Sequence, residues 1–436
     1  MTTGPEGAGD RRRRRSSPFF LAVACTVPGV ALRLTGAHPD PVLQAVLFGL
    51  AIVGAAFLLS WAAEVAQLDV SAGLAIAILA FIAVLPEYAV DLVFAWKGGN
   101  AVEQFGSSCR APGATGESSC SLALANMTGA NRLLIGIGWS LVVFIAWYQW
   151  KRRGERNDCI QLERRHTVEL SFLTVASAYS LTLPLKRTIT LVDAALLVGL
   201  FVAYTTRVSR APAEEPHLVG PAASVGALSQ SRRRWTVVVL FVFSAAVIVG
   251  CAELFAEALV DTGKEFGVSE FLLVQWLAPL ASEAPELLVA GLYAWRLNTD
   301  AGLGTLVSSK VNQWTLLVGT LPIVFAIASG SASGLPIVAR QREELLLTAA
   351  QSVFAVAVLS NLAISIREAG GLFALFWAQF LLGAVVPESA HGVELVIVSA
   401  IYLLLAAVIL LRRFRDMGRM VKDGFGTPYE QLAQTP

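Results

Sequence analysis

Charged residues are scarce in this sequence. Asp, Glu, Lys and Arg together make up 15% of the 436 residues, whereas about a quarter is usual in a soluble domain. Hydrophobic residues make up 55%. The net charge of +1 by itself says nothing about acidic or nucleic-acid partners, and we expect no nucleic-acid partner. This balance excludes an ordinary soluble protein and predicts a chain that lies in a lipid bilayer.

Histidine is almost absent as well. The four histidines are His38, His166, His217 and His391, and none lies deep in a clear apolar run. A proton relay inside the membrane would therefore have to use carboxylates or lysine.

Several motifs of other function classes are missing. The sequence has no Gly-x-x-x-x-Gly-Lys-Ser/Thr loop that would bind a nucleotide for primary transport. It has no His-Glu-x-x-His, no Gly-x-Ser-x-Gly and no paired Asp residues in facing apolar runs. Cys25, Cys159 and Cys251 are isolated, which disfavours a metal cluster. We therefore expect neither enzymatic activity nor a bound cofactor, and no protein partner is indicated.

Apolar runs of roughly 20 residues recur along the whole chain, long enough to cross a hydrocarbon core. They predict an all-α polytopic membrane protein with about twelve transmembrane helices. The expected spans are 18–36, 41–63, 70–96, 121–150, 167–185, 188–206, 235–260, 269–296, 303–330, 344–366, 371–386 and 391–411. The first run could instead be a signal peptide behind an arginine cluster.

Basic clusters predict the orientation. They lie at 11–15 before the first span, at 151–156 after the fourth, at 207–234 between the sixth and seventh, and at 412–422 after the last. All four fall on one side if both termini are cytoplasmic, as the positive-inside rule requires. We expect a multi-pass protein of the plasma membrane with both termini in the cytoplasm.

The predicted organisation has five parts. They are an arginine-rich N-terminus with an extra first helix (1–40), a first half (41–206), a cytoplasmic linker (207–234), a second half (235–386), and an extra last helix with a cytoplasmic tail (387–436). The linker is polar and lacks apolar periodicity, which is typical of a flexible segment, and the tail also reads as solvated.

Cys109 and Cys120 lie in a Gly/Ser-rich insertion, 98–120, that this topology places outside the cell. A disulfide that closes this loop fits an oxidising compartment. The alternative is two free thiols on the loop.

One short motif occurs twice. Pro86-Glu87 begins the first copy and Pro285-Glu286 the second, and Pro, Glu, Val, Ala and Trp match at a constant offset of 199. Further matches follow downstream at an offset of 181, including Asn131 with Asn312. The copies fall in the third and eighth spans, an odd number apart, so they run antiparallel. The sequence therefore predicts two inverted-topology repeats, an arrangement that places a binding site near the membrane midplane.

These motifs resemble the α-repeats of the calcium/cation antiporter superfamily, of the sodium/calcium exchanger type. Each repeat of that family has a Pro-Glu-containing stretch followed by a Gly-Asn-x-x-Gly-Ser-Asn-like stretch. In the first repeat here, the second element is Ala125-Asn126-Met127-Thr128-Gly129-Ala130-Asn131. The resemblance covers roughly 41–386 and implies exchange of Ca²⁺, or a related cation, for Na⁺ or H⁺ by alternating access.

The residues themselves agree with such a site. Proline disrupts the helix around it and frees backbone carbonyls, which with a neighbouring Glu give hard oxygen ligands for Ca²⁺ or Na⁺. We expect Glu87 and Glu286 to meet as the central metal ligands and, when no cation is bound, to compete for a proton. Asn126 would add an amide oxygen, and Thr128 a hydroxyl or a packing contact.

The second repeat departs from the family pattern. Glu283 stands near Ser282, at a hydroxyl position, and adds a third carboxylate to the predicted ligands. Val307 replaces the amide that Asn126 supplies in the first repeat, and Lys310 replaces Gly129. Further candidates for ligands or for tuning the charge of the site are Asn131, Asn312, Ser308, Ser309, Thr128 and Ser282.

A lysine at membrane depth needs a partner, and Glu283 or Glu286 is the expected one. We hypothesise that the Lys310 ammonium occupies the place or charge of a Na⁺, which favours proton coupling or single-cation exchange. The alternative is that Lys310 extends toward the cytoplasm from near the start of its helix.

Three other acidic residues lie inside the predicted spans. Asp91, four residues after Glu87, could support the ligands from behind. Glu64 and Glu253 recur in both halves, which indicates a shared role such as a proton path or a helix contact.

Two further functions remain open at this point. One is Na⁺/H⁺ exchange, and the other is a degenerate transporter fold that acts as a sensor or scaffold. Inorganic cations and the lipid bilayer are the only partners that the sequence indicates.

Overall fold

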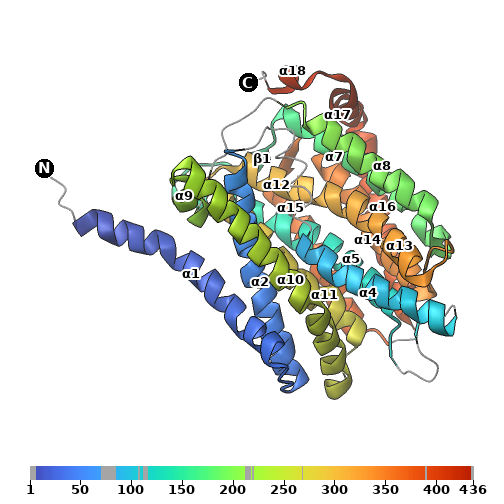
Figure 1. The fold of residues 1–436 in the computed structure, drawn as a ribbon. Coiled ribbons are helices and arrows are strands. Elements are labelled where there is room, and N and C mark those ends of the chain that lie inside the picture. The colour runs from blue at the N-terminus through green and yellow to red at the C-terminus, as the bar shows by residue number, and fades with distance from the viewer. Residues whose placement is uncertain are drawn as a thin grey trace, which may run out of the picture.

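The computed structural model describes residues 6–69, 85–106, 109–110, 116–211, 218, 220–267, 269–387 and 390–433, without the side chains of 6–17, 85–87, 384 and 433. Within these ranges the chain is mostly helical, as expected, and its helices pack side by side in a bundle (Figure 1). Figure 1 shows the first half of α1 (Glu6–Thr35) projecting away from that bundle.

The first half of the chain, after α1, has its own series of described helices and strands. They are α2 (Pro41–Ala66), α4 (Leu85–Phe105), α5 (Ser119–Leu133), the π-helical segment η1 (Leu134–Trp139), α6 (Ser140–Arg152), β1 (Cys159–Gln161), η2 (Arg164–His166), α7 (Thr167–Ser180), η3 (Leu183–Leu185), β2 (Thr188–Ile189) and α8 (Leu191–Val208). The predicted third span begins in 70–84, which lies outside the described residues.

The second half of the chain has a further series of helices and strands. Its elements are α9 (Pro221–Gly226), α10 (Gln230–Phe266), α11 (Glu270–Trp295), α12 (Thr299–Asn312), the π-helical segment η4 (Gln313–Leu317), α13 (Val318–Ser329), β3 (Leu335–Pro336), α14 (Ala339–Leu359), β4 (Ala363–Ser365), α15 (Ile366–Val385), α16 (His391–Arg412), α17 (Phe414–Gly426) and α18 (Tyr429–Ala433).

Eight of the described helical segments are long and apolar enough to cross a membrane. They are Pro18–Thr35, Pro41–Ala66, Ser119–Arg152, Arg164–Leu185, Leu191–Val208, Gln230–Phe266, Thr299–Ser329 and His391–Arg412. Each coincides with a predicted span. The total of twelve stays a prediction.

Two short antiparallel ladders, which the sequence did not predict, join the halves of the chain. β1 pairs with β4, with Ile160 opposite Ile364, and β2 pairs with β3, with Ile189 opposite Leu335. Each ladder connects a loop of the first half to a loop of the second. The halves are thereby tied together through backbone hydrogen bonds as well as through packed helices.

The core of the bundle lies around α5 and α12. Every residue of α5 from Cys120 to Leu133 is buried, as are most residues of α12. Each of these helices continues into a π-helical segment, η1 beginning three residues after Asn131 and η4 directly after Asn312. π-Helical turns within α-helices are rare and occur often at functional sites, because they turn the following side chains to a new direction.

The described parts of the linker and of the tail contain helices that the polar sequence does not indicate. In the linker, α9 buries Ala222 against Leu58 and Trp61 of α2, and α10 begins at Gln230. In the tail, α17 packs on α7 so closely that a Cβ added to Gly424 would lie 2.1 Å from the Ser171 hydroxyl oxygen. Both segments therefore form part of the folded body.

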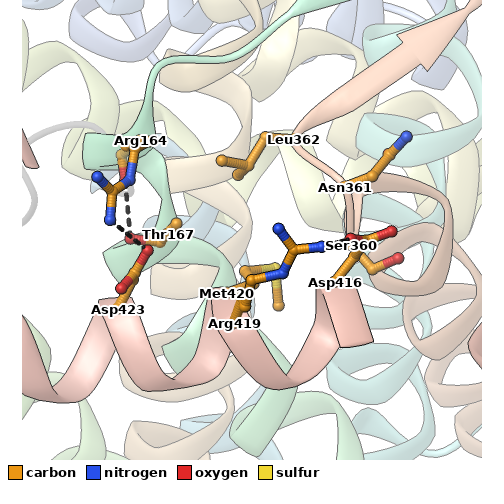
Figure 2. Close-up of a pocket in the computed structure, with 9 residues that line it drawn as sticks. All are labelled: Arg164, Thr167, Ser360, Asn361, Leu362, Asp416, Arg419, Met420 and Asp423. Carbon is orange, nitrogen blue, oxygen red and sulfur yellow. Dashed lines mark hydrogen bonds and ion pairs between the residues drawn. The ribbon is translucent and has the colours of Figure 1, made fainter. Parts of the chain in front are cut away.

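Charged pairs hold α17 in place. Arg164 lies 2.7 Å from Asp423, and Arg413 lies 2.6 Å from Glu368 of α15. A pocket of about 280 Å³ lies between α17, the start of α7 and the end of α14, as Figure 2 shows. Its charged side chains pair with one another, Arg164 with Asp423 and Arg419 with Asp416. We therefore assign the pocket to the interface between α17 and the rest of the bundle.

Cys109 and Cys120 are joined by a disulfide, with their Cα atoms 5.9 Å apart. The bond anchors the loop after α4 to the start of α5.

Candidate cation-binding site

The site is built on four helices, α4, α5, α11 and α12. Pro279 and Pro285 both lie inside α11, and each removes the backbone N–H that would have bonded the carbonyl four residues earlier. For Pro279 the freed carbonyl is that of Gln275. Gly129 of α5 lies directly against it, since a Cβ at this glycine would be 1.6 Å from the Gln275 oxygen. The glycine therefore permits the close approach of α5 to α11.

In the first repeat, Asp91 and Asn126 form a buried pair. Asp91 is fully buried in α4, and the Asn126 Nδ2 atom donates to its Oδ1 atom at 2.8 Å. The other end of this amide, Asn126 Oδ1, is buried and accepts no hydrogen bond from any described residue. The aspartate thus fixes the amide so that its oxygen faces away from α4.

Glu87 lies in the first turn of α4, but its side chain belongs to the part of the chain that is not described. The backbone places it four residues before Asp91, one helical turn along the same face. The predicted meeting of Glu87 with Glu286 stays a prediction.

In the second repeat, two carboxylates lie in the interior of the bundle. Glu283 is fully buried and accepts a hydrogen bond from the Nε2 atom of Gln313, the first residue of η4. Both carboxylate oxygens of Glu286 are buried as well. The hydroxyl of Ser282 donates back to the carbonyls of Ala278 and Pro279, at 3.3 and 3.2 Å.

Lys310 is fully buried, so it does not extend toward the cytoplasm. Its Nζ atom donates to two oxygens of Asn131, the backbone oxygen and Oδ1, each at 2.6 Å. The ammonium also lies 5.5 Å from the centre of the Trp314 ring. A lysine of the second repeat thus occupies two potential ligand oxygens of the first.

The remaining predicted residues differ in their surroundings. Thr128 donates to the Leu124 carbonyl at 2.8 Å and receives a contact of 3.4 Å from Gln275. Ser309 and Asn312 are buried, and their side-chain oxygens have no hydrogen-bond partner among the described residues. Ser308 is half-buried, and its side chain lies next to the Tyr204 hydroxyl.

Glu64 and Glu253 do not share one location. The oxygens of Glu64 are buried near Tyr293, at the end of α11. Glu253 lies on the surface of α10 and 3.4 Å from Lys97 of α4, which also contacts Glu257 at 2.6 Å. The two acids thus have different surroundings, one buried and one exposed.

Sequence reasoning missed Gln275, Gln313 and Lys97. Gln275 stands four residues before Pro279, a spacing that indicates a freed carbonyl, and Gln313 directly follows the matched Asn312. No comparable signal marks Lys97.

Comparison with known proteins places the chain among ion exchangers. Residues 41–209 and 236–410 match the family described as sodium/calcium exchanger protein. A solved structure of the H⁺/Ca²⁺ exchanger CAX is 41% identical, with a TM-score of 0.84, and covers 96% of this chain and 98% of its own. Among curated proteins, none matches.

A more distant structure shares the fold alone. The Ca²⁺/H⁺ antiporter protein YfkE is 15% identical with a TM-score of 0.56, over 89% of this chain and 99% of its own.

Proposed function

Because the chain belongs to the sodium/calcium exchanger family, we propose that it is a secondary antiporter that exchanges Ca²⁺, or a closely related cation, for H⁺. Binding would take place at a midplane site of carboxylate and amide oxygens, and transport would proceed by alternating access. The ligands would be Glu87, Glu283 and Glu286 with the Asn126 amide oxygen, a set of hard oxygens that suits Ca²⁺. The 41% identical H⁺/Ca²⁺ exchanger supports this choice of ions.

The Lys310–Asn131 contact is the observation that supports H⁺ rather than Na⁺ as the coupling ion. An ammonium held 2.6 Å from both Asn131 oxygens withdraws them from any metal ion and repels a second cation beside them. The carboxylates nevertheless outnumber this single ammonium. Excess negative charge in a buried site is offset by a bound divalent cation or by protons, and protons need no oxygen cage.

We propose the inverted-repeat architecture on three features. Each half has a Pro-Glu motif, and a π-helical segment follows it, after α5 in the first half and after α12 in the second. Each half also supplies two short strands, and the first strand of either half pairs with the second strand of the other. With twelve spans, both termini would lie in the cytoplasm of a plasma-membrane protein.

The test is ⁴⁵Ca²⁺ uptake into proteoliposomes, first under an imposed Na⁺ gradient and then under an imposed pH gradient. Wild type is compared with Glu87→Gln and Glu286→Gln, and Glu265→Gln on the surface of α10 is the control. We expect uptake driven by the pH gradient, lost in both site variants and retained in the control. If neither gradient drives Ca²⁺ flux, the proposal is rejected and Na⁺/H⁺ exchange is favoured. Absence of any ion flux favours a sensor or scaffold.

A further inference from the structure

A second group of buried charges lies outside the repeat motifs. It consists of Arg132 of α5, Glu344 of α14 and Glu394 of α16, which are 1%, 6% and 8% exposed. The Arg132 Nη2 atom lies 2.8 Å from Glu344 Oε2, and the guanidinium lies over the Trp276 ring, 4.9 Å from its centre. Arg132 and Glu344 therefore form an ion pair inside the bundle.

Glu394 adds a second carboxylate to this pair. It lies close enough to Glu344 and Arg132 to interact with both electrostatically. Neither of its buried oxygens accepts a hydrogen bond from any residue that the structure describes. The Arg132–Glu344 pair is neutral as a whole, so Glu394 adds a further buried negative charge that no ion pair with Arg132 compensates. A buried charge without such compensation is costly, and binding of a proton removes that cost.

The group has a connection to water. His391, at the start of α16, has a side chain that is 31% exposed, and its Nδ1 atom lies 3.9 Å from Glu394 Oε2. An imidazole can pass a proton between water and a buried carboxylate. The other acid at this end is Glu343, which lies beside Gly392. Tyr402 of α16 is also buried and lies close enough to Arg132 to interact with it electrostatically.

The group also adjoins the candidate cation site. Arg132 directly follows Asn131, whose two oxygens hold the Lys310 ammonium. The backbone oxygen of Arg132 in turn accepts a contact of 3.4 Å from Gln351 Nε2. A change of charge at Glu394 therefore acts on a guanidinium one residue away from the Lys310 contact.

We propose that Glu394 is a proton-binding residue of the transport cycle, held beside the Arg132–Glu344 ion pair and reached from water through His391. This inference rests on the proposed exchange of a cation for H⁺ and assigns a second proton site to it, apart from the cation ligands. In the cycle the imidazole passes a proton from water to the carboxylate, and alternating access lets the proton leave on the other side of the membrane.

Transport provides the first test. The initial rate of ⁴⁵Ca²⁺ uptake is measured against pH for wild type, Glu394→Gln, Glu394→Asp and the surface control Glu265→Gln. We expect Glu394→Gln to lose one titration step from the profile and about tenfold in rate at the optimum. Glu394→Asp should restore the step and the control should match wild type. A Glu394→Gln profile with every wild-type titration step overturns the inference, whatever its absolute rate.

Infrared difference spectroscopy on the purified protein provides the second test and does not depend on transport. A carboxylic-acid band that appears at low pH in wild type should be missing in Glu394→Gln. A band unchanged by the substitution overturns the inference. By contrast, wild type that shows no uptake under a pH gradient contradicts the proposed function, and the infrared result then decides the proton site alone.

Discussion

Asp91 and Asn126 are held together by a hydrogen bond of 2.8 Å between two helices, and both residues are almost completely buried. The bond uses the amide nitrogen of Asn126 and leaves its oxygen directed elsewhere. Asp91 has no counterpart in the second repeat, where Ala290 stands at the matching position. Asp91 therefore orients, in the first repeat, the amide that the sequence predicts as a ligand.

Replacing Asp91 by Ala should weaken cation binding. The Asn126 amide would lose a charge-assisted hydrogen bond of about 1.5–3 kcal/mol, so its oxygen would no longer be fixed. We expect the KM for Ca²⁺ in the proteoliposome assay to rise about tenfold or more. Glu103→Ala, at an exposed position of the same helix, is the control. An unchanged KM in Asp91→Ala would show that the amide is oriented by other groups.

Replacing Lys310 by Met should change ion selectivity. The variant removes the ammonium from the Asn131 oxygens but keeps an unbranched side chain of similar length. We expect Na⁺ to inhibit Ca²⁺ uptake more strongly than in wild type, since two oxygen ligands become available. Lys264→Met, on the surface of α10, should behave as wild type. The same coupling ion and the same pH dependence in Lys310→Met would contradict the role given to this lysine.

Adding a methyl group at Gly129 should destabilise the fold. Its Cβ would lie 1.6 Å from the Gln275 carbonyl oxygen, and neither backbone can move without separating α5 from α11. We expect Gly129→Ala to cost about 1–3 kcal/mol or more and to lower the melting temperature in detergent. Gly199→Ala is the matched control, because its Cβ meets nothing within 4 Å and alanine favours the helix. Equal melting temperatures for the two variants would refute the packing argument.

The ion pairs of Asp69 predict that the folded protein loses stability in acid. This residue, after the end of α2, lies 2.7 Å from Arg233 and 3.1 Å from Arg234. The hydrogen bond from Arg233 lowers the pKa of the Asp69 carboxyl from 3.8 to about 2, against the opposing effect of burial. Because the folded-state pKa lies below the unfolded one, the contribution is complete above about pH 4 and is lost as the pH falls toward 2. Melting temperatures measured over this range should fall less steeply in Asp69→Asn than in wild type.

The sequence predicted the helical membrane architecture and the family correctly, because both depend on local signals. Apolar runs of about 20 residues mark spans, and the Pro-Glu motifs are contiguous in the chain. The Lys97–Glu257 contact and the Arg132–Glu344 ion pair were not predicted, since each joins residues more than 150 positions apart. Which faces of two helices meet is decided by packing of the whole bundle, and hydropathy contains no such information.

The contacts of the C-terminal tail were also not predicted from the sequence. Its many charges indicate a solvated segment, yet Asp423 and Arg413 find partners on the bundle, and Gly424 lets α17 pack against α7. The π-helical segments η1 and η4 likewise have no sequence signature that distinguishes them from the α-helices around them.

The β1–β4 and β2–β3 ladders mean that the polypeptide between α8 and α9 is not the only connection between the two halves. A chain broken there would still have two strand pairings and the contacts of α5 with α11 and of α4 with α13 to keep its fragments together. Two separately expressed fragments, meeting at this break, should therefore find each other in the bilayer and assemble into one working transporter.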